Sequence, residues 1–345
     1  MPNALFEGLD IGLYSVSSTA DNRAVAQKAE ERGFKRVWLA EDHHSRDLIV
    51  QATAVAAATK TIEIGLGIVN PFTRHPAQIA MAIADIEEMA GPRMVLGLGA
   101  AHSAINAHGL KNPRPITALR EAGEICTRML RGERVVFEGK VFQLPPPGAK
   151  LRFPLTRTKV PLYFGTRGPQ TLRRVVPIAD GIKFSVFTTP AFAKICVGHL
   201  EDALAETNRS IDDLDVSCYI ILSVDRDRST ARNAAKPLVA HYVRQVPDTT
   251  RFEFAGLDVT RMLALKRELR TAFFAGTFQE AIEALPDDVV DALAVTGTPD
   301  DCIEGLEAYA AVGIKTPVLY QSLGPDRLAA IDLIADQIRP NLLAE

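Results

Sequence analysis

Residues 61–99 read TIEIGLGIVNPFTRHPAQIAMAIADIEEMAGPRMVLGLG. Short apolar runs open and close this stretch, TIEIGLGI at 61–68 and RMVLGLG at 93–99, and both carry alternating glycines. Between them, residues 75–89 place apolar side chains at helical spacing. The stretch therefore predicts a strand, a helix and a second strand, which is the repeating unit of proteins with parallel β-sheets.

The same alternation continues on both sides of this stretch. Six further strands are predicted, at 9–16, 36–40, 160–165, 180–186, 216–224 and 316–322. Helices are predicted between them, at 21–31, 48–59 and 116–130, from about 170, at 190–206, and from 298 and 326. Eight such units in a chain of 345 residues predict an α/β fold of the (β/α)8 TIM-barrel type. An open doubly wound sheet is the alternative.

Two segments interrupt the alternation. Residues 135–148, VVFEGKVFQLPPPG, contain two short β runs around Gly139 and then three prolines, which predicts a hairpin insertion after the fourth helix. Residues 229–286 form a long, irregular helical stretch, which predicts a helical insertion after strand seven. We expect a single domain over 1–345 with insertions at about 133–159 and 226–290.

Composition favours a globular protein that binds small molecules. The net charge of -3 comes from 39 basic and 42 acidic residues that are interspersed, which argues against nucleic acid or a membrane as a partner. No window approaches the roughly 18 apolar residues of a membrane span, and the N-terminus lacks a signal-peptide pattern. We therefore expect a cytoplasmic protein. The cysteines are far apart and predict buried small residues in a reducing compartment, at Cys126, Cys196, Cys218 and Cys302.

In a TIM barrel, the loops that follow the strands build the active site. After the second strand stand Glu41, Asp42, His43 and His44. Metal binding is one interpretation, but adjacent residues at a strand end point in different directions and cannot all face one ion. A structural interpretation has Asp42 and His43 cap the barrel mouth through hydrogen bonds. The functional interpretation places these two side chains beside a ring-shaped cofactor.

Glycines end both the third and the fourth strand. In GLGIVNP at 65–71 they predict a bulge or the close approach of a flat ligand, with relief of crowding in the barrel wall as the alternative. In GLGAAH at 97–102, His102 stands where a dinucleotide-binding motif needs its third glycine. His102 is a candidate for proton exchange near neutral pH, or else an exposed loop histidine. His75 is predicted to cap the next helix and has no catalytic role.

The fifth strand leads directly from GTRGP at 165–169 into a helix. Backbone N–H groups at a helix start, with the positive end of its dipole and Arg167 nearby, predict a phosphate-binding site. A plain loop before a proline-initiated helix is the structural alternative.

Together these motifs resemble the luciferase-like superfamily of flavin-dependent barrel enzymes, and within it the branch that uses coenzyme F420, a deazaflavin. The resemblance is closest to the methylenetetrahydromethanopterin reductases. It is carried by five segments, WLAEDHHSR, IGLGIVNPFTRHPAQIAMAIADIEEMAGPRMVLGLG, VPLYFGTRGPQTL, VTGTPDD and QSLGPD.

The resemblance implies that the deazaflavin ring stacks over a bulged third strand with a cis peptide between Gly67 and Ile68. It also implies that Asp42 and His43 line the ring and that the backbone around Gly168 binds the cofactor phosphate. Catalytic roles fall to His43 and His102. The implied cofactor-binding set is Asp42, His43, Gly67, Ile68, Val69, Asn70, Gly97, Gly99, Ala100, Gly165, Thr166, Arg167, Gly168 and Pro169.

Two positions depart from the reductases. Tyr14 stands where they have a glutamate, and His102 stands where they have an aspartate, so the pterin substrate does not follow from the resemblance. The sequence thus predicts an F420-dependent oxidoreductase that moves a hydride to or from a small organic substrate. Alternatives are a monooxygenase that uses reduced FMN from a partner flavin reductase, and a non-catalytic cofactor-binding barrel. The family commonly forms homodimers through the helices after strands two and three, which are alanine-rich here. Burial of these faces inside the monomer is the alternative.

Overall fold

The computed structural model describes residues 4–14, 16–42, 44–111, 114–246 and 249–343. Contacts between residues divide the chain into two compact units. The first unit comprises residues 12–183 and 198–216, and the second comprises residues 1–11, 184–197 and 217–345. The expected single domain over the whole chain remains a prediction.

Eight short strands form a parallel barrel. They are β1 (Asp10–Tyr14), β2 (Arg36–Ala40), β3 (Glu63–Val69), β4 (Met94–Leu98), β7 (Leu162–Gly165), β8 (Gly181–Phe184), β9 (Asp215–Val224) and β11 (Thr316–Leu323). Their order in the sheet is β9-β11-β1-β2-β3-β4-β7-β8, and a further pairing of β8 with β9 closes the ring. The predicted (β/α)8 barrel is confirmed.

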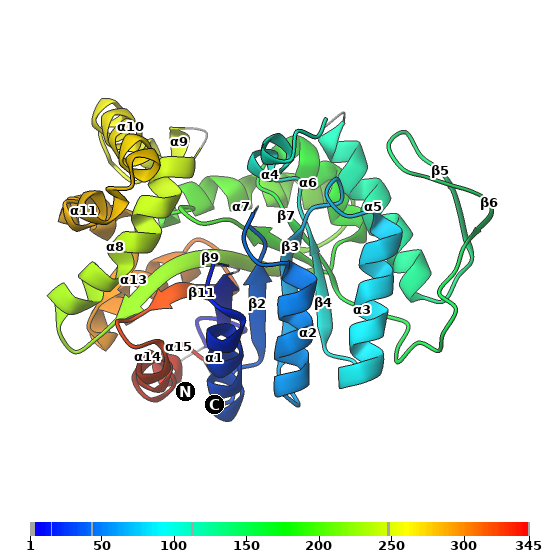
Figure 1. The fold of residues 1–345 in the computed structure, drawn as a ribbon, viewed down its shortest axis with the longest axis horizontal. Helices are drawn as coiled ribbons and strands as arrows, with labels where there is room; N and C mark the ends of the chain where they lie inside the picture. Colours follow the sequence, from blue (N-terminus) through cyan, green and yellow to red (C-terminus); the bar gives the residue numbers. More distant parts are fainter. Residues whose placement is uncertain (1–3, 15, 43, 112–113, 247–248, 344–345) are drawn as a thin grey trace. The chain divides into compact units, whose positions relative to one another are not determined.

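The first unit carries helices on the outside of its strands. They are α1 (Thr19–Glu31), α2 (Leu48–Ala58), α3 (Pro76–Ala90), α4 (His102–Ala107), α5 (Pro115–Leu130), α6 (Pro169–Val175) and a short 3-10 helix (Val176–Ile178). Helices α1, α2 and α3 lie side by side (Figure 1). Small buried residues such as Ala52 and Ala80 allow this close packing.

The hairpin insertion is present where the prolines predicted it. Strand β5 (Val135–Glu138) pairs antiparallel with β6 (Gln143–Ala149), which contains the three prolines. Buried Glu121 of α5 anchors the turn, because its carboxylate accepts the backbone N–H groups of Lys140, Val141 and Phe142 at 2.7–3.0 Å.

The second unit contains the helical insertion after β9. Its helices are α8 (Arg228–Gln245), α9 (Thr250–Phe254), α10 (Val259–Ala275), α11 (Phe278–Glu283) and α12 (Asp287–Leu293). Strand β10 (Val295–Gly297) then pairs with the end of β9, and α13 (Pro299–Ala310), α14 (Arg327–Leu333), a π-helix (Ile334–Ile338) and α15 (Arg339–Leu342) follow. Helix α7 (Pro190–Ala205) begins in this unit and ends in the first. The sequence did not predict β10, because three residues are too few to show a period.

The cysteines are placed as the sequence predicted. All four cysteines are buried, which confirms them as small core residues. Within the described ranges, no helix is long and apolar enough to span a lipid bilayer.

Candidate active site

The predicted site residues that the structure describes all lie in the first unit. Strands β2, β3, β4 and β7 are consecutive neighbours in the sheet. Because parallel strands end at the same edge, the loops that follow these four strands share one end of the unit.

Strand β3 is bulged at the predicted place. Leu66 pairs with Leu96 and Val69 pairs with Leu98, so β3 fits one extra residue against β4. The peptide bond between Gly67 and Ile68 is cis, as the resemblance implied.

Three glycines of the neighbouring strands accommodate this bulge. A Cβ atom at Gly99 would lie 2.6 Å from Cγ1 of Ile68, and one at Gly165 would lie 2.7 Å from Cγ2 of the same side chain. At Gly97 a Cβ atom would overlap the carbonyl oxygen of Leu66. We call Gly97, Gly99, Gly165 and the bulge residues Gly67 and Ile68 the glycine cradle. The three glycines make room for the bulged backbone and for the Ile68 side chain, and glycine at strand ends is typical of places where backbone or a ligand approaches closely.

Asn70 connects three loops through hydrogen bonds. Its side-chain oxygen accepts the N–H of Phe72 at 3.0 Å, and its Nδ2 donates to the carbonyl oxygen of Ala101 at 3.4 Å. Its backbone N–H donates to the Glu41 carboxylate at 3.3 Å. The buried side chain of Asn70, predicted to bind cofactor, therefore hydrogen-bonds within the protein and connects the loops after β2, β3 and β4.

A cavity of about 310 Å³ opens beside Asp42. Its lining combines acidic, basic and imidazole side chains, from Glu41, Asp42, His44, Arg46, Asp47, Arg74 and His108 among others. Arg74 pairs with Asp47 at 2.6 Å, and the His44 and His108 rings meet edge to face at 4.9 Å between centroids. Among the described residues, no three His, Cys, Asp or Glu side chains are placed to hold a metal ion.

Glu41, which lines this cavity, has an altered pKa. Burial raises the pKa of its carboxyl group, against the opposing effects of the Asn70 N–H and of Arg74. The sequence placed Glu41 only in a polar cluster; its contact with Asn70 depends on the bulge and was not predicted.

The two predicted catalytic histidines are His43 and His102. His43 lies outside the described residues. His102 is the first residue of α4, four residues after the end of β4, but its side chain lies outside the described part of the chain. Helix α4 was not predicted from the sequence, because a helix of six residues shows no clear periodicity.

The predicted phosphate-binding loop follows β7. Thr166, Arg167 and Gly168 are half-buried, and α6 begins at Pro169, as the proline predicted. A Cβ atom at Gly168 would meet no atom within 4 Å, and its φ of -77° suits any residue. Neither packing nor backbone conformation therefore requires glycine at this position. The absence of neighbouring atoms means that there is open space beside the start of α6.

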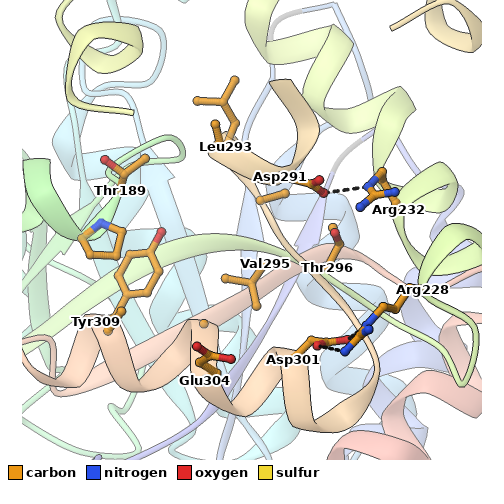
Figure 2. Close-up of a pocket in the computed structure, with 15 residues that line it drawn as sticks. Thr189, Arg228, Arg232, Asp291, Leu293, Val295, Thr296, Asp301, Glu304 and Tyr309 are labelled. Atoms are coloured by element: carbon orange, nitrogen blue, oxygen red, sulfur yellow. Dashed lines mark hydrogen bonds and ion pairs between the residues drawn. The ribbon is translucent and has the colours of Figure 1, made fainter. Parts of the chain in front are cut away.

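A larger cavity, of about 530 Å³, lies in the second unit and contains none of the predicted site residues (Figure 2). Its arginines already bind carboxylates: Arg228 is paired with Asp301 and Arg232 with Asp291, each at 2.7 Å. The predicted site residues that the structure describes lie in the first unit.

Comparisons with known proteins agree with this geometry. The family model described as luciferase-like monooxygenase matches residues 5–316. A 5,10-methylenetetrahydromethanopterin reductase from Archaeoglobus fulgidus is 33% identical over 315 residues, which cover 91% of this chain and 93% of that protein. A putative coenzyme F420-dependent oxidoreductase from Mycobacterium tuberculosis is 25% identical, covering 90% and 94%.

Among solved structures, the coenzyme F420-dependent tetrahydromethanopterin reductase from Methanopyrus kandleri is similar over the whole chain. The TM-score is 0.87 at 28% sequence identity, and 99% of each chain is covered.

Proposed function

This chain belongs to the luciferase-like monooxygenase family, and on that premise we propose that it is a coenzyme F420-dependent oxidoreductase. It transfers a hydride between the cofactor and a small organic substrate. The observation that carries the proposal is the glycine cradle, where the glycines that follow or end β4 and β7 make room for the bulge of β3 at the carboxyl end of the barrel.

The residues present fit a flat, phosphorylated cofactor. Gly97, Gly99 and Gly165 make room for the Leu66 carbonyl group and the Ile68 side chain, and so allow β3 to bulge here. The bulge itself would support the ring, and the open backbone at Gly168 would receive the phosphate. The deazaflavin supplies the hydride chemistry when bound, and the protein supplies binding and orientation.

The chain's own contribution to chemistry is to handle the proton that accompanies the hydride. We assign this role to His102 or His43, because each lies within four residues after the end of a strand, β4 or β2, at the carboxyl end of the barrel. Replacement of the correct histidine by alanine should lower kcat/KM at least 100-fold, the usual scale of general acid–base catalysis. A change of only a few-fold across the pH range, in either variant, would remove that histidine from the mechanism.

The substrate is proposed as a small organic compound and not as a pterin. The relatives named above include pterin reductases, but Tyr14 and His102 stand where the resembling enzymes carry acidic groups. We propose that both differences change what is bound while hydride transfer itself is kept.

Direct titration of the purified protein with F420 and with FMN tests the cofactor. We expect F420 to bind at least tenfold more tightly than FMN, a difference of about 1.4 kcal/mol. Tighter binding of FMN would support the reduced-FMN monooxygenase instead. Tight F420 binding without turnover of any aldehyde, alcohol, ketone or enone would support the non-catalytic barrel. Failure to bind either cofactor would refute the proposal.

We also propose that the protein forms a homodimer through α2 and α3. These neighbouring helices leave large apolar side chains exposed, with Val50 at 62%, Met81 at 50% and Met89 at 53%. Light scattering of wild type, of Val50→Lys with Met81→Lys, and of Leu328→Lys as a control tests this. A dimer that persists in the double variant would contradict the proposed interface.

A further inference from the structure

A basic cavity lies at the open end of the β5–β6 hairpin, in the first unit. Its volume is about 420 Å³, and we call it the hairpin cavity. Three of its six lining residues are cationic and none is acidic, although the whole chain carries a net charge of -3. The lining consists of Arg134, Gly148, Ala149, Lys150, Leu151 and Arg152. The proposed function makes no use of this cavity.

The register of the hairpin brings two of the cations together. Val135 of β5 pairs with Ala149 of β6, so the residues just beyond this pair, Arg134 and Lys150, adjoin each other. Arg134 is held over β6, because its Nη1 donates to the carbonyl oxygen of Gly148 at 3.4 Å. The pairing of the strands therefore concentrates positive charge at one place.

Small residues leave room between these charges. Gly148 has a φ of +84°, and a Cβ atom there would lie 2.7 Å from the carbonyl oxygen of Val135, so the backbone conformation and the close approach of the strands both require glycine. Gly148 and Ala149 add little side chain to the lining, and the buried Leu151 adds an apolar one. The cavity thus combines cationic side chains with an apolar contact.

The protein does not neutralise these three cations. Within the described ranges, no carboxylate forms an ion pair with Arg134, Lys150 or Arg152. The neighbouring Glu133 pairs instead with Arg128, at 2.9 Å. Like charges that adjoin each other across two strands destabilise a hairpin, and a bound anion would remove this repulsion.

We propose that the hairpin cavity binds a small organic phosphate. A phosphate group carries up to two negative charges and three terminal oxygens, so it can accept hydrogen bonds from three cations at once, two of them forked guanidinium groups. Small-molecule sites span roughly 300–1,000 Å³, so the cavity has room for an organic group beside Leu151. Its lining shares no residue with the set predicted to bind the cofactor, and the inference goes beyond the proposed function.

Calorimetric titration with phenyl phosphate tests the inference, at constant ionic strength so that screening is the same throughout. Lys150→Met removes one charge from the cavity, and Arg152→Met removes another. All of these cations are exposed, so neither change disturbs the core. Lys140→Met is the matched control, because Lys140 is an exposed lysine in the turn of the same hairpin and does not line the cavity.

Wild type should show a saturable site for phenyl phosphate, and Lys150→Met and Arg152→Met should each weaken it about tenfold, the scale of one hydrogen bond to a charged group. Lys140→Met should match wild type. Inorganic phosphate should bind more weakly than phenyl phosphate, since it lacks the contact with Leu151. The absence of a saturable site in wild type, or equal affinity in all four proteins, would overturn the inference.

Two further measurements separate this site from others. Without phosphate, Lys150→Met should melt at or above the temperature of wild type, because the repulsion is relieved, whereas phenyl phosphate should raise the melting temperature of wild type more than that of the variant. The affinity for F420 should be the same in both proteins. A parallel loss of F420 affinity in Lys150→Met would make the cavity part of the cofactor site and so overturn the inference, while leaving the proposed function standing.

Discussion

At the scale of single residues, the site depends on the fit between Ile68 and the glycines of two other strands. The side chain of Ile68 occupies the space where Cβ atoms of Gly99 and Gly165 would lie. Overpacking of this kind costs about 1–3 kcal/mol, because neighbouring atoms must move. A methyl group here therefore changes the shape of the surface that would support the ring.

Gly99→Ala tests this fit. Its Cβ atom displaces Ile68, so we expect about a tenfold loss of F420 affinity together with a lower melting temperature. Ile68→Ala removes the two carbons that the new methyl group would contact. The double variant Gly99→Ala, Ile68→Ala should therefore recover stability relative to Gly99→Ala alone. Strictly additive effects in thermal unfolding would show that the two positions do not interact.

Gly168 offers the opposite case, a glycine with open space around it. Gly168→Leu should fold as stably as wild type, since a Cβ atom there meets nothing. If the backbone at this position binds the cofactor phosphate, the leucine should still lower F420 affinity tenfold or more. Gly198→Leu is the control, because Gly198 has equally open space but lies in α7. Equal F420 affinity in both variants and wild type would place the phosphate elsewhere.

At the scale of elements, the ends of the helices are set by specific caps. His75 precedes α3, and its Nδ1 accepts the N–H of Ala77 at 3.2 Å. This is the cap that the His75-Pro76 pair predicted. Burial lowers the pKa of His75 below the 6.5 typical of an unfolded histidine, and only the neutral ring can accept this hydrogen bond.

The His75 cap predicts a pH dependence of stability. As the pH falls through 6.5, the unfolded chain takes up a proton at this position before the folded chain does, so stability falls with decreasing pH. His75→Asn keeps an N-cap acceptor and removes the titration. Between pH 7.5 and 5.5, its melting temperature should therefore decrease less than that of wild type. Parallel melting curves for the two proteins over this range would be inconsistent with the assignment.

At the scale of the whole molecule, the first unit is held together partly by polar contacts between strands that are distant in sequence. Arg36 of β2 binds Glu63 of β3 and Asp215 of β9, and its guanidinium lies 5.3 Å from the Trp38 ring centroid. Removing one partner of a buried ion pair is more damaging than removing a surface pair, because the remaining charge stays in a poorly solvated place.

Arg36→Met should therefore destabilise the protein by about 1–3 kcal/mol, measured by chemical denaturation, because Asp215 is only 18% exposed whereas Glu63 is 35% exposed. Arg128→Met is the comparison, since the ion pairs of Arg128 with Glu124 and Glu133 are partly exposed. We expect that change to cost less than about 1 kcal/mol. Equal losses in the two variants would show that the buried cluster has no special role in stability.

The sequence alone was sufficient for the barrel and for the order of its eight strands. Strand β2 begins and ends at the predicted residues, the three prolines fall in a hairpin, and Pro169 starts α6 as predicted. These features depend on local periodicity, on caps and on the backbone limits of proline and glycine, all of which are visible in a short stretch of chain. Elements as short as β10 and α4 gave no such signal.

Only the tertiary structure decided which residues meet. The contact of Ile68 with Gly99 and Gly165, the bond from Asn70 to Glu41 and the position of Lys183 on Trp38 each join segments from different strands or loops. Barrel closure, strand register and the extra residue in β3 determine these neighbours. A linear sequence shows which side chains are available, but the distance between them is set by how the strands pair, and hydride and proton chemistry depends on that distance.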